Sequence, residues 1–77
     1  MEKMVTDTRT VQDATAVALG LQIRDRRRAL NISQEELAEL AGVSLRFLGS
    51  LERGKSTVRL SAMLAVCKAL GLTVTLS

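Results

Sequence analysis

Arginine and amide side chains are the groups in this sequence with the most evident chemistry. The chain of 77 residues contains no histidine and a single cysteine, and it has neither a clustered carboxylate dyad nor a glycine-rich phosphate loop. Acid–base catalysis, a zinc site and an internal disulfide therefore lack their usual residues. We expect a protein that is not an enzyme and that has no cofactor and no metal. Lysine and arginine exceed the acids by 11 to 8, which suits a polyanionic partner.

One short segment presents basic side chains on a face without acids. In SLRFLGSLERG, residues 44–54, helical spacing places three apolar residues on one face, Phe47, Leu48 and Leu51. The opposite face holds Arg46, Gly49 and Arg53 at its centre, with Leu45 and Ser50 at its margins. A DNA major groove about 12 Å wide accepts one helix when nothing bulky or acidic holds it off the base edges. Gly49 permits close approach, and Arg46 can bind a guanine with two hydrogen bonds.

The hydrophobic pattern predicts four helices that position this face, over about residues 11–30, 34–41, 45–53 and 60–70. Ser33 and Glu36 have the spacing of a capping box at the start of the second helix. Gly42 supplies the turn that follows, and Ser44 caps the third helix. Two helices joined by a short glycine turn form a helix-turn-helix. Gln34, at the amino end of the second helix, can bind a phosphate oxygen there.

The other expected features concern helix ends and the core. Thr10 is expected to cap the first helix, and Gly71 to end the fourth. The inward-facing residues predicted are Leu19, Ile23 and Leu30 in the first helix, Leu37, Ala38, Leu40 and Ala41 in the second, and Leu60, Met63, Leu64, Cys67 and Leu70 in the fourth. Cys67 is then a small core hydrophobe. The predicted organisation is an arm at 1–10, an all-α domain at 11–71 and a strand at 72–77.

The last six residues, LTVTLS, alternate apolar and polar side chains and predict a β-strand. No other segment predicts a strand that could pair with it. The helices also carry surplus apolar residues, Val11, Ala14, Ala18 and Leu21 in the first, and Ala62, Ala65, Val66 and Ala69 in the fourth. A homodimer would pair the strand with its own copy and bury the alanine-rich stripe against Leu72, Val74 and Leu76. The alternative is that the amino-terminal arm folds back over one stripe.

Three motifs resemble the helix-turn-helix of the phage-repressor-like Xre family: QEELA at residues 34–38, AGVS at 41–44 and LERGK at 51–55. A fuller pattern is similar to the HipB-type antitoxins: LG at 19–20, IR at 23–24, Arg27, and ALGL at 69–72. The resemblance implies a compact lambda-repressor-like domain of four to five helices. It also implies a dimeric repressor that binds a palindromic operator in double-stranded DNA and a HipA-type serine/threonine kinase toxin.

By position, the resemblance assigns base reading to five residues, Ser44, Leu45, Arg46, Gly49 and Ser50. It assigns contacts with the DNA backbone to Gln34 and Lys55. Arg53 is a further candidate for a phosphate contact, with a solvated charge as the alternative. The resemblance also implies a structural ion pair between Arg27 and Glu52.

Two functions remain open at this point: an antitoxin that represses its own operon, or a stand-alone Xre-type repressor without a toxin. A third is an interaction module that has lost DNA binding. Arg24, Arg26 and Arg28 are either contacts with phosphate or toxin, or a solvated helix face. We expect a cytoplasmic, nucleoid-associated protein, because no apolar run is long enough to span a membrane and no secretory signal is recognisable.

Overall fold

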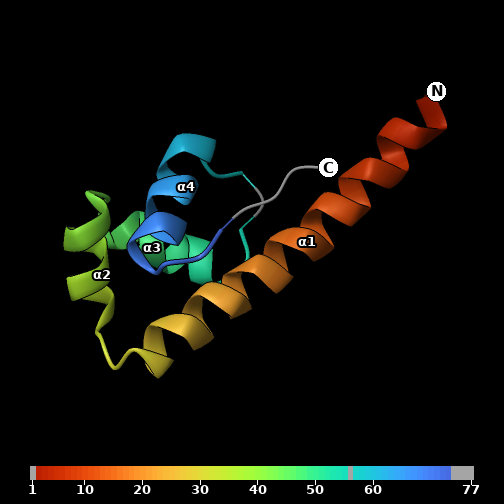
Figure 1. Cartoon of the computed structure of the whole chain (residues 1–77). Helices are drawn as coiled ribbons and strands as arrows, with labels where there is room; N and C mark the ends of the chain where they lie inside the picture. The colour runs from red at the N-terminus through yellow and green to blue at the C-terminus, as the bar shows by residue number, and fades with distance from the viewer. Residues whose placement is uncertain (1, 56, 74–77) are drawn as a thin grey trace.

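Four helices make up the described part of the chain, for which the computed structural model covers residues 2–55 and 57–73, with side chains from residue 14 onward. They are α1 (Glu2–Ala29), α2 (Gln34–Ala41), α3 (Leu45–Glu52) and α4 (Leu60–Ala69). In Figure 1, α2, α3 and α4 lie together beside the carboxy-terminal half of α1, whose amino-terminal part extends beyond them. The prediction of an all-α, four-helix domain is confirmed. None of the helices in these ranges is long and apolar enough to cross a membrane.

Helix α1 is longer than the sequence pattern predicts. It begins at Glu2, so Thr10 lies inside the helix and is not its N-cap. Most of the arm predicted at 1–10 is therefore part of the same helix. Neither glycine nor proline precedes Gly20 in the chain, and nothing else in this segment interrupts a helix. At its other end Asn31 takes a left-handed φ of 61° and stops the helix.

The turn between α2 and α3 follows the capping residues that the sequence predicts. Ser33 Oγ accepts a hydrogen bond from the Glu36 backbone N–H at 3.0 Å, and Glu36 Oε1 accepts one from the Ser33 N–H at 2.9 Å. Gly42 ends α2 with a left-handed φ of 71°. Ser44 Oγ then accepts from the Phe47 N–H at 3.0 Å and starts α3. These local bonds set the angle between the two helices before any long-range packing is considered.

The hydrophobic core draws residues from all four helices. α2 packs against α3 and α4, and α1 packs against α3. Eight apolar residues are buried: Ile23, Leu37, Ala38, Leu48, Leu51, Val66, Cys67 and Leu70. Burial also raises the pKa of the Cys67 thiol.

Four leucines predicted to face inward are exposed instead: Leu30, Leu40, Leu60 and Leu64. Leu30 follows the last residue of α1, so helical spacing no longer determines the direction of its side chain. Leu40 and Leu64 each lie roughly 110° around the helix axis from the centre of the buried stripe. Leu60 is the first residue of α4, where no preceding turn covers it. In α2 and α4 the buried stripe is therefore narrower than the apolar one.

The residues predicted to form a dimer interface have mixed outcomes. Val66 is fully buried in the core of the protomer, so its assignment to a dimer surface is wrong. Ala69 and Leu72 pack against the same core, whereas Ala62 and Ala65 are half-buried. Leu72 and Thr73 are not in a strand, and Val74 and Leu76 lie outside the described residues. On α1, Ala14, Ala18 and Leu21 are exposed; the side chain of Val11 lies outside the described part.

Gly20 allows α1 and α3 to approach closely. A Cβ atom on Gly20 would lie 2.5 Å from the Leu51 carbonyl oxygen and 2.9 Å from that of Glu52. Both are backbone atoms, which cannot move aside as a flexible side chain can. The absence of a side chain at Gly20 therefore fixes how deeply the last turn of α3 sits against α1.

Candidate nucleic-acid interface

The outer face of α3 is open to solvent. Five residues predicted to read bases lie on this side of the molecule: Ser44, Leu45 and Arg46 are exposed, and Gly49 and Ser50 are half-buried. The inner face holds the buried Leu48 and Leu51, and Phe47 packs against the core. Leu45 keeps 46% of its surface exposed beside the basic Arg46. An apolar and a basic side chain together suit a major groove, where thymine offers a methyl group and guanine two acceptors.

A hollow of about 260 Å³ borders the outer face on the side of the loop after α3. Its polar lining comes from Ser44, Arg46, Ser50, Lys55 and Thr57. Lys55, a predicted phosphate contact, is exposed here and can meet a backbone phosphate next to the bases. Sequence reasoning did not find Thr57. The path of the loop places Thr57 here, and helical periodicity gives no information about a loop.

Arg53 lies back across Gly49 rather than projecting straight outward. Its Nη2 atom donates to Ser50 Oγ at 3.4 Å, and its Nη1 atom would be 3.2 Å from a Cβ atom on Gly49. Because Gly49 has no side chain, the guanidinium group of Arg53 fits against it. For the same reason, no side chain projects from α3 at this position. Arg53 remains exposed, so its charge is available to a phosphate.

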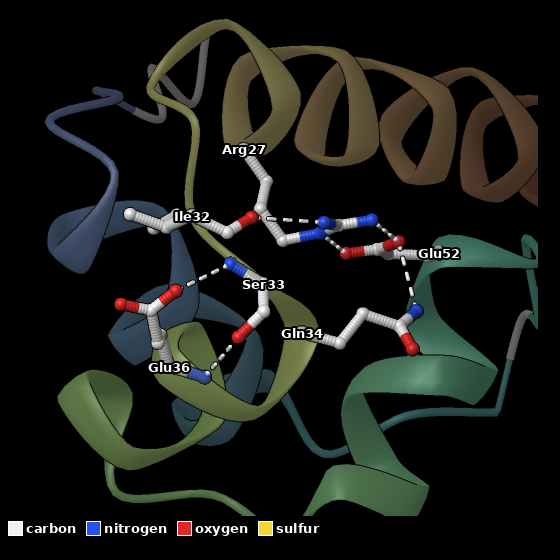
Figure 2. Close-up of polar contacts among 6 residues, drawn as sticks. All are labelled: Arg27, Ile32, Ser33, Gln34, Glu36 and Glu52. Atoms are coloured by element: carbon white, nitrogen blue, oxygen red, sulfur yellow. Dashed lines mark hydrogen bonds and ion pairs between the residues drawn. The ribbon is translucent and has the colours of Figure 1, made fainter.

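Beneath this face, Arg27 of α1 and Glu52 of α3 form a buried ion pair. Arg27 Nε lies 2.7 Å from Glu52 Oε2, and Arg27 Nη2 lies 3.1 Å from Glu52 Oε1. Arg27 Nη1 also donates to the Ile32 carbonyl at 3.0 Å, and Gln34 Nε2 donates to Glu52 Oε1 at 3.0 Å (Figure 2). One carboxylate thus connects α1, α2 and α3. Gln34, a predicted phosphate contact, uses its side-chain nitrogen inside the protein.

The charges of this network reinforce one another. Burial would raise the pKa of the Glu52 carboxyl, but hydrogen bonds from Arg27 and Gln34 and the charges of Arg27 and Arg24 lower it below its ordinary value. The hydrogen bond to Glu52 raises the pKa of Arg27 in turn. Both groups therefore stay ionised at neutral pH, and the pair holds the three helices as a charged unit.

The arginine run at 24–28 divides among three environments. Arg27 is buried in the ion pair, and Arg26 Nε donates to the Leu70 carbonyl at the end of α4 at 3.1 Å. Arg24 and Arg28 line a second hollow, of about 390 Å³, together with Gln34, Gly49 and Arg53. This hollow borders the outer face of α3 on the side opposite the loop. The outer face therefore lies between two hollows, each lined by basic side chains.

A glycine turn between two capped helices, with a basic outer face on the second, defines a helix-turn-helix domain. Residues 23–76 match a family model described as helix-turn-helix. The chain belongs to this Xre-like helix-turn-helix family.

Relatives within the family are regulators by name. An uncharacterised HTH-type transcriptional regulator, y4mF of Sinorhizobium fredii, is 40% identical over 78% of this chain and 79% of its own length. The control protein C.SmaI of Serratia marcescens is 39% identical over 73% of this chain and 67% of its own. An uncharacterised transcriptional regulator in the ATPase CF(0) region of Rhodospirillum rubrum is 37% identical over 88% of this chain and 62% of its own.

A solved structure has the same fold. The restriction-modification controller protein C.AhdI of Aeromonas hydrophila superposes with a TM-score of 0.70 at 37% sequence identity. The match covers 78% of this chain and 91% of that one.

Proposed function

We propose that this protein regulates transcription by binding DNA sequence-specifically, with α3 as the recognition helix. The observation that carries the proposal is the exposed face of α3, which presents Arg46 and Leu45 between two basic hollows. An α-helix with side chains fills a major groove, so the two phosphate backbones would border it on either side. Base reading falls to five residues, Ser44, Leu45, Arg46, Gly49 and Ser50.

Phosphate contacts in this proposal come from both flanks of α3. Lys55 lies on the loop side, and Arg53 and Gln34 lie on the side of α1 and α2. Since the side-chain nitrogen of Gln34 donates to Glu52, Gln34 would meet a phosphate through its backbone N–H at the start of α2. These contacts would position the helix without carrying sequence information.

The regulator acts, in this proposal, without a kinase toxin. The four proteins named above are described as regulators, a control protein and a controller protein, and none as an antitoxin. The expected HipA-type partner and the antitoxin role are left without support. The stand-alone repressor, the second of the two hypotheses, is therefore the better one.

A second candidate function is control of restriction-modification genes. It is favoured by the likeness to C.AhdI, which extends over most of that protein, and by the likeness to C.SmaI. The gene neighbourhood distinguishes this function from general repression: adjacent methyltransferase and endonuclease genes support it, and unrelated neighbours remove its support.

The regulator binds DNA as a homodimer in this proposal. The alternating sequence at 72–77 and the exposed apolar residues Val17 and Leu21 on α1 support a second copy as the partner. Two reading helices would then meet two halves of a palindromic operator.

The test uses the DNA upstream of the gene itself. Fluorescence anisotropy with that duplex and with a scrambled duplex, at increasing salt, separates specific from general binding. We expect tighter binding to the upstream duplex at every salt concentration. Equal affinity for both duplexes would contradict sequence-specific recognition of this region, and no binding to either would favour an interaction module.

A further inference from the structure

The hollow between α1, α2 and α3 contains an excess of positive charge. Four arginines line it, Arg24, Arg27, Arg28 and Arg53, against two acids, Glu35 and Glu52. Within residues 14–55 and 57–73 the one ion pair is that of Arg27 with Glu52, which neutralise each other. Three cationic side chains then face a single exposed carboxylate. A concave surface with this balance attracts an anion.

Arg24 contributes a hydrogen-bond donor without an acceptor. Its Nε atom is buried and has no hydrogen-bond partner among the residues that the structure describes. Because a buried polar atom without a partner is unfavourable, such an atom beside a hollow indicates a missing acceptor. The flat guanidinium group of arginine matches the oxygens of a phosphate better than a single point charge would.

The position of the hollow identifies the source of the phosphate. Gly49 and Arg53 belong to α3, so the hollow and the reading face share one wall. When α3 occupies a major groove, a strand of the DNA backbone runs beside that wall. A free phosphate could bind the same groups, but only a duplex brings a phosphate here as a consequence of α3 binding.

We propose that Arg24 and Arg28 of α1, with Arg53 of α3, form a binding site for one phosphodiester of the DNA strand that borders the recognition helix. The inference rests on the proposed function and deepens it. Through this site α1, which otherwise supports α3 from behind, contacts DNA directly. The site adds affinity for any sequence, because a phosphate is common to all of them.

The test measures binding of the full chain to a fluorescent duplex of arbitrary sequence across a salt titration. Arg24→Gln and Arg28→Gln remove one charge each, and Lys68→Gln on α4 is the control with the same charge change outside the hollow. Losing one phosphate contact should weaken binding about eightfold at about 0.1 M salt and reduce the slope of log K against log salt by about 1. We expect part of this loss in each single variant and all of it in the Arg24→Gln, Arg28→Gln double variant. Lys68→Gln, the charge-matched control for each single variant, should change binding at most slightly.

Thermal melts accompany the binding data, because Arg24 is half-buried and its replacement could alter the fold. Arg28 is exposed, so Arg28→Gln alone keeps the test decisive if Arg24→Gln melts early. If the wild type binds DNA and the two single variants and the double variant bind it equally well, the arginine site is overturned. The proposed function is not affected by that result. A wild-type chain that binds no duplex overturns the proposed function, and the DNA assignment with it.

Adding inorganic phosphate at constant ionic strength tests whether the hollow binds a free phosphate instead of a DNA phosphodiester. If phosphate raises the melting temperature of the wild type but not of Arg28→Gln, and DNA affinity is the same for both, the hollow binds a free anion and the assignment to DNA is overturned.

Discussion

Among single residues, Glu52 joins α3 to two other helices. This carboxylate accepts hydrogen bonds from Arg27 of α1 and Gln34 of α2, while its own backbone belongs to α3. The sequence alone suggests this pair only through a family resemblance, because the two residues are 25 positions apart and no local pattern links them. The structure supplies the reason for it, since the pair fixes α3 relative to its two neighbours.

The first prediction concerns the removal of Glu52. Glu52→Ala should destabilise the fold by about 3–5 kcal/mol, because Arg27 would remain buried without its counter-charge. Thermal or urea unfolding followed by circular dichroism measures the effect. Glu39→Ala, which removes an exposed acid from α2, is the control and should change the unfolding free energy little. An unfolding curve unchanged by Glu52→Ala would mean that the pair does not support the fold.

The second prediction concerns pH. The pKa of Glu52 is lower in the folded chain than its ordinary value of about 4.3, so its stabilising contribution is complete above that pH. As the pH falls below about 4.3 toward the folded pKa, the contribution is lost. The stability difference between the wild type and Glu52→Gln should therefore shrink in acid. A difference that stays constant between neutral and acidic pH would contradict the assignment.

Among the helices, the sequence predicts the helix-turn-helix well and the start of α1 less well. Ser33, Gly42 and Ser44 act through local bonds, so the sequence alone places α2, the turn and α3. Thr10 predicts an N-cap because a threonine can cap a helix, yet α1 continues through it. The four exposed leucines differ from the prediction for another reason: apolar character does not tell which sides of a helix have neighbours.

The candidate site shows the same division between local and long-range information. Helical periodicity alone identifies the exposed face of α3 with Arg46. It could not reveal the hollow lined by Arg24 and Arg28, since that hollow exists only where α1 meets α2 and α3. Gly20 belongs to a family pattern, and a glycine inside a long helix is itself a signal of close packing.

The third prediction compares two glycines inside helices. Gly20→Ala should destabilise the fold by about 1–3 kcal/mol, because the new methyl group meets backbone oxygens of α3. Gly49→Ala should stabilise it by about 0.5–1 kcal/mol, because alanine favours helix and only the mobile end of Arg53 must shift. Chemical unfolding of the two variants measures both changes in the free energy of unfolding, which should have opposite signs. Stabilisation by Gly20→Ala would contradict the close approach of α1 and α3.

In the whole molecule, α1 offers apolar surface to a second copy of the chain. α1 carries Val17 and Leu21, each about half exposed, along a helix that extends beyond the other three (Figure 1). A domain of this size buries a small core, so apolar surface shared with a second copy would add stability that the single chain lacks. Dimerisation and operator binding would then depend on each other.

The fourth prediction tests the dimer through the alternating sequence at the end of the chain. Val74→Asp should shift the protein toward monomer in sedimentation and weaken DNA binding, because the charge falls on the apolar side of the alternation. Thr73→Asp, on the polar side, is the control and should leave the dimer intact. If Val74→Asp and Thr73→Asp sediment alike, the interface lies elsewhere. If the wild type is monomeric, the proposed dimer is wrong.

Selection of bound duplexes from a random pool tests whether α3 reads bases. The wild-type chain should enrich a palindromic sequence, and Arg46→Ala should enrich a sequence relaxed at one position of each half, with affinity lower by about 1–3 kcal/mol. Lys55→Ala should weaken binding to every duplex and leave the enriched sequence unchanged. Enrichment of the same sequence by the wild type and Arg46→Ala, or no enrichment by either, would contradict base reading by α3.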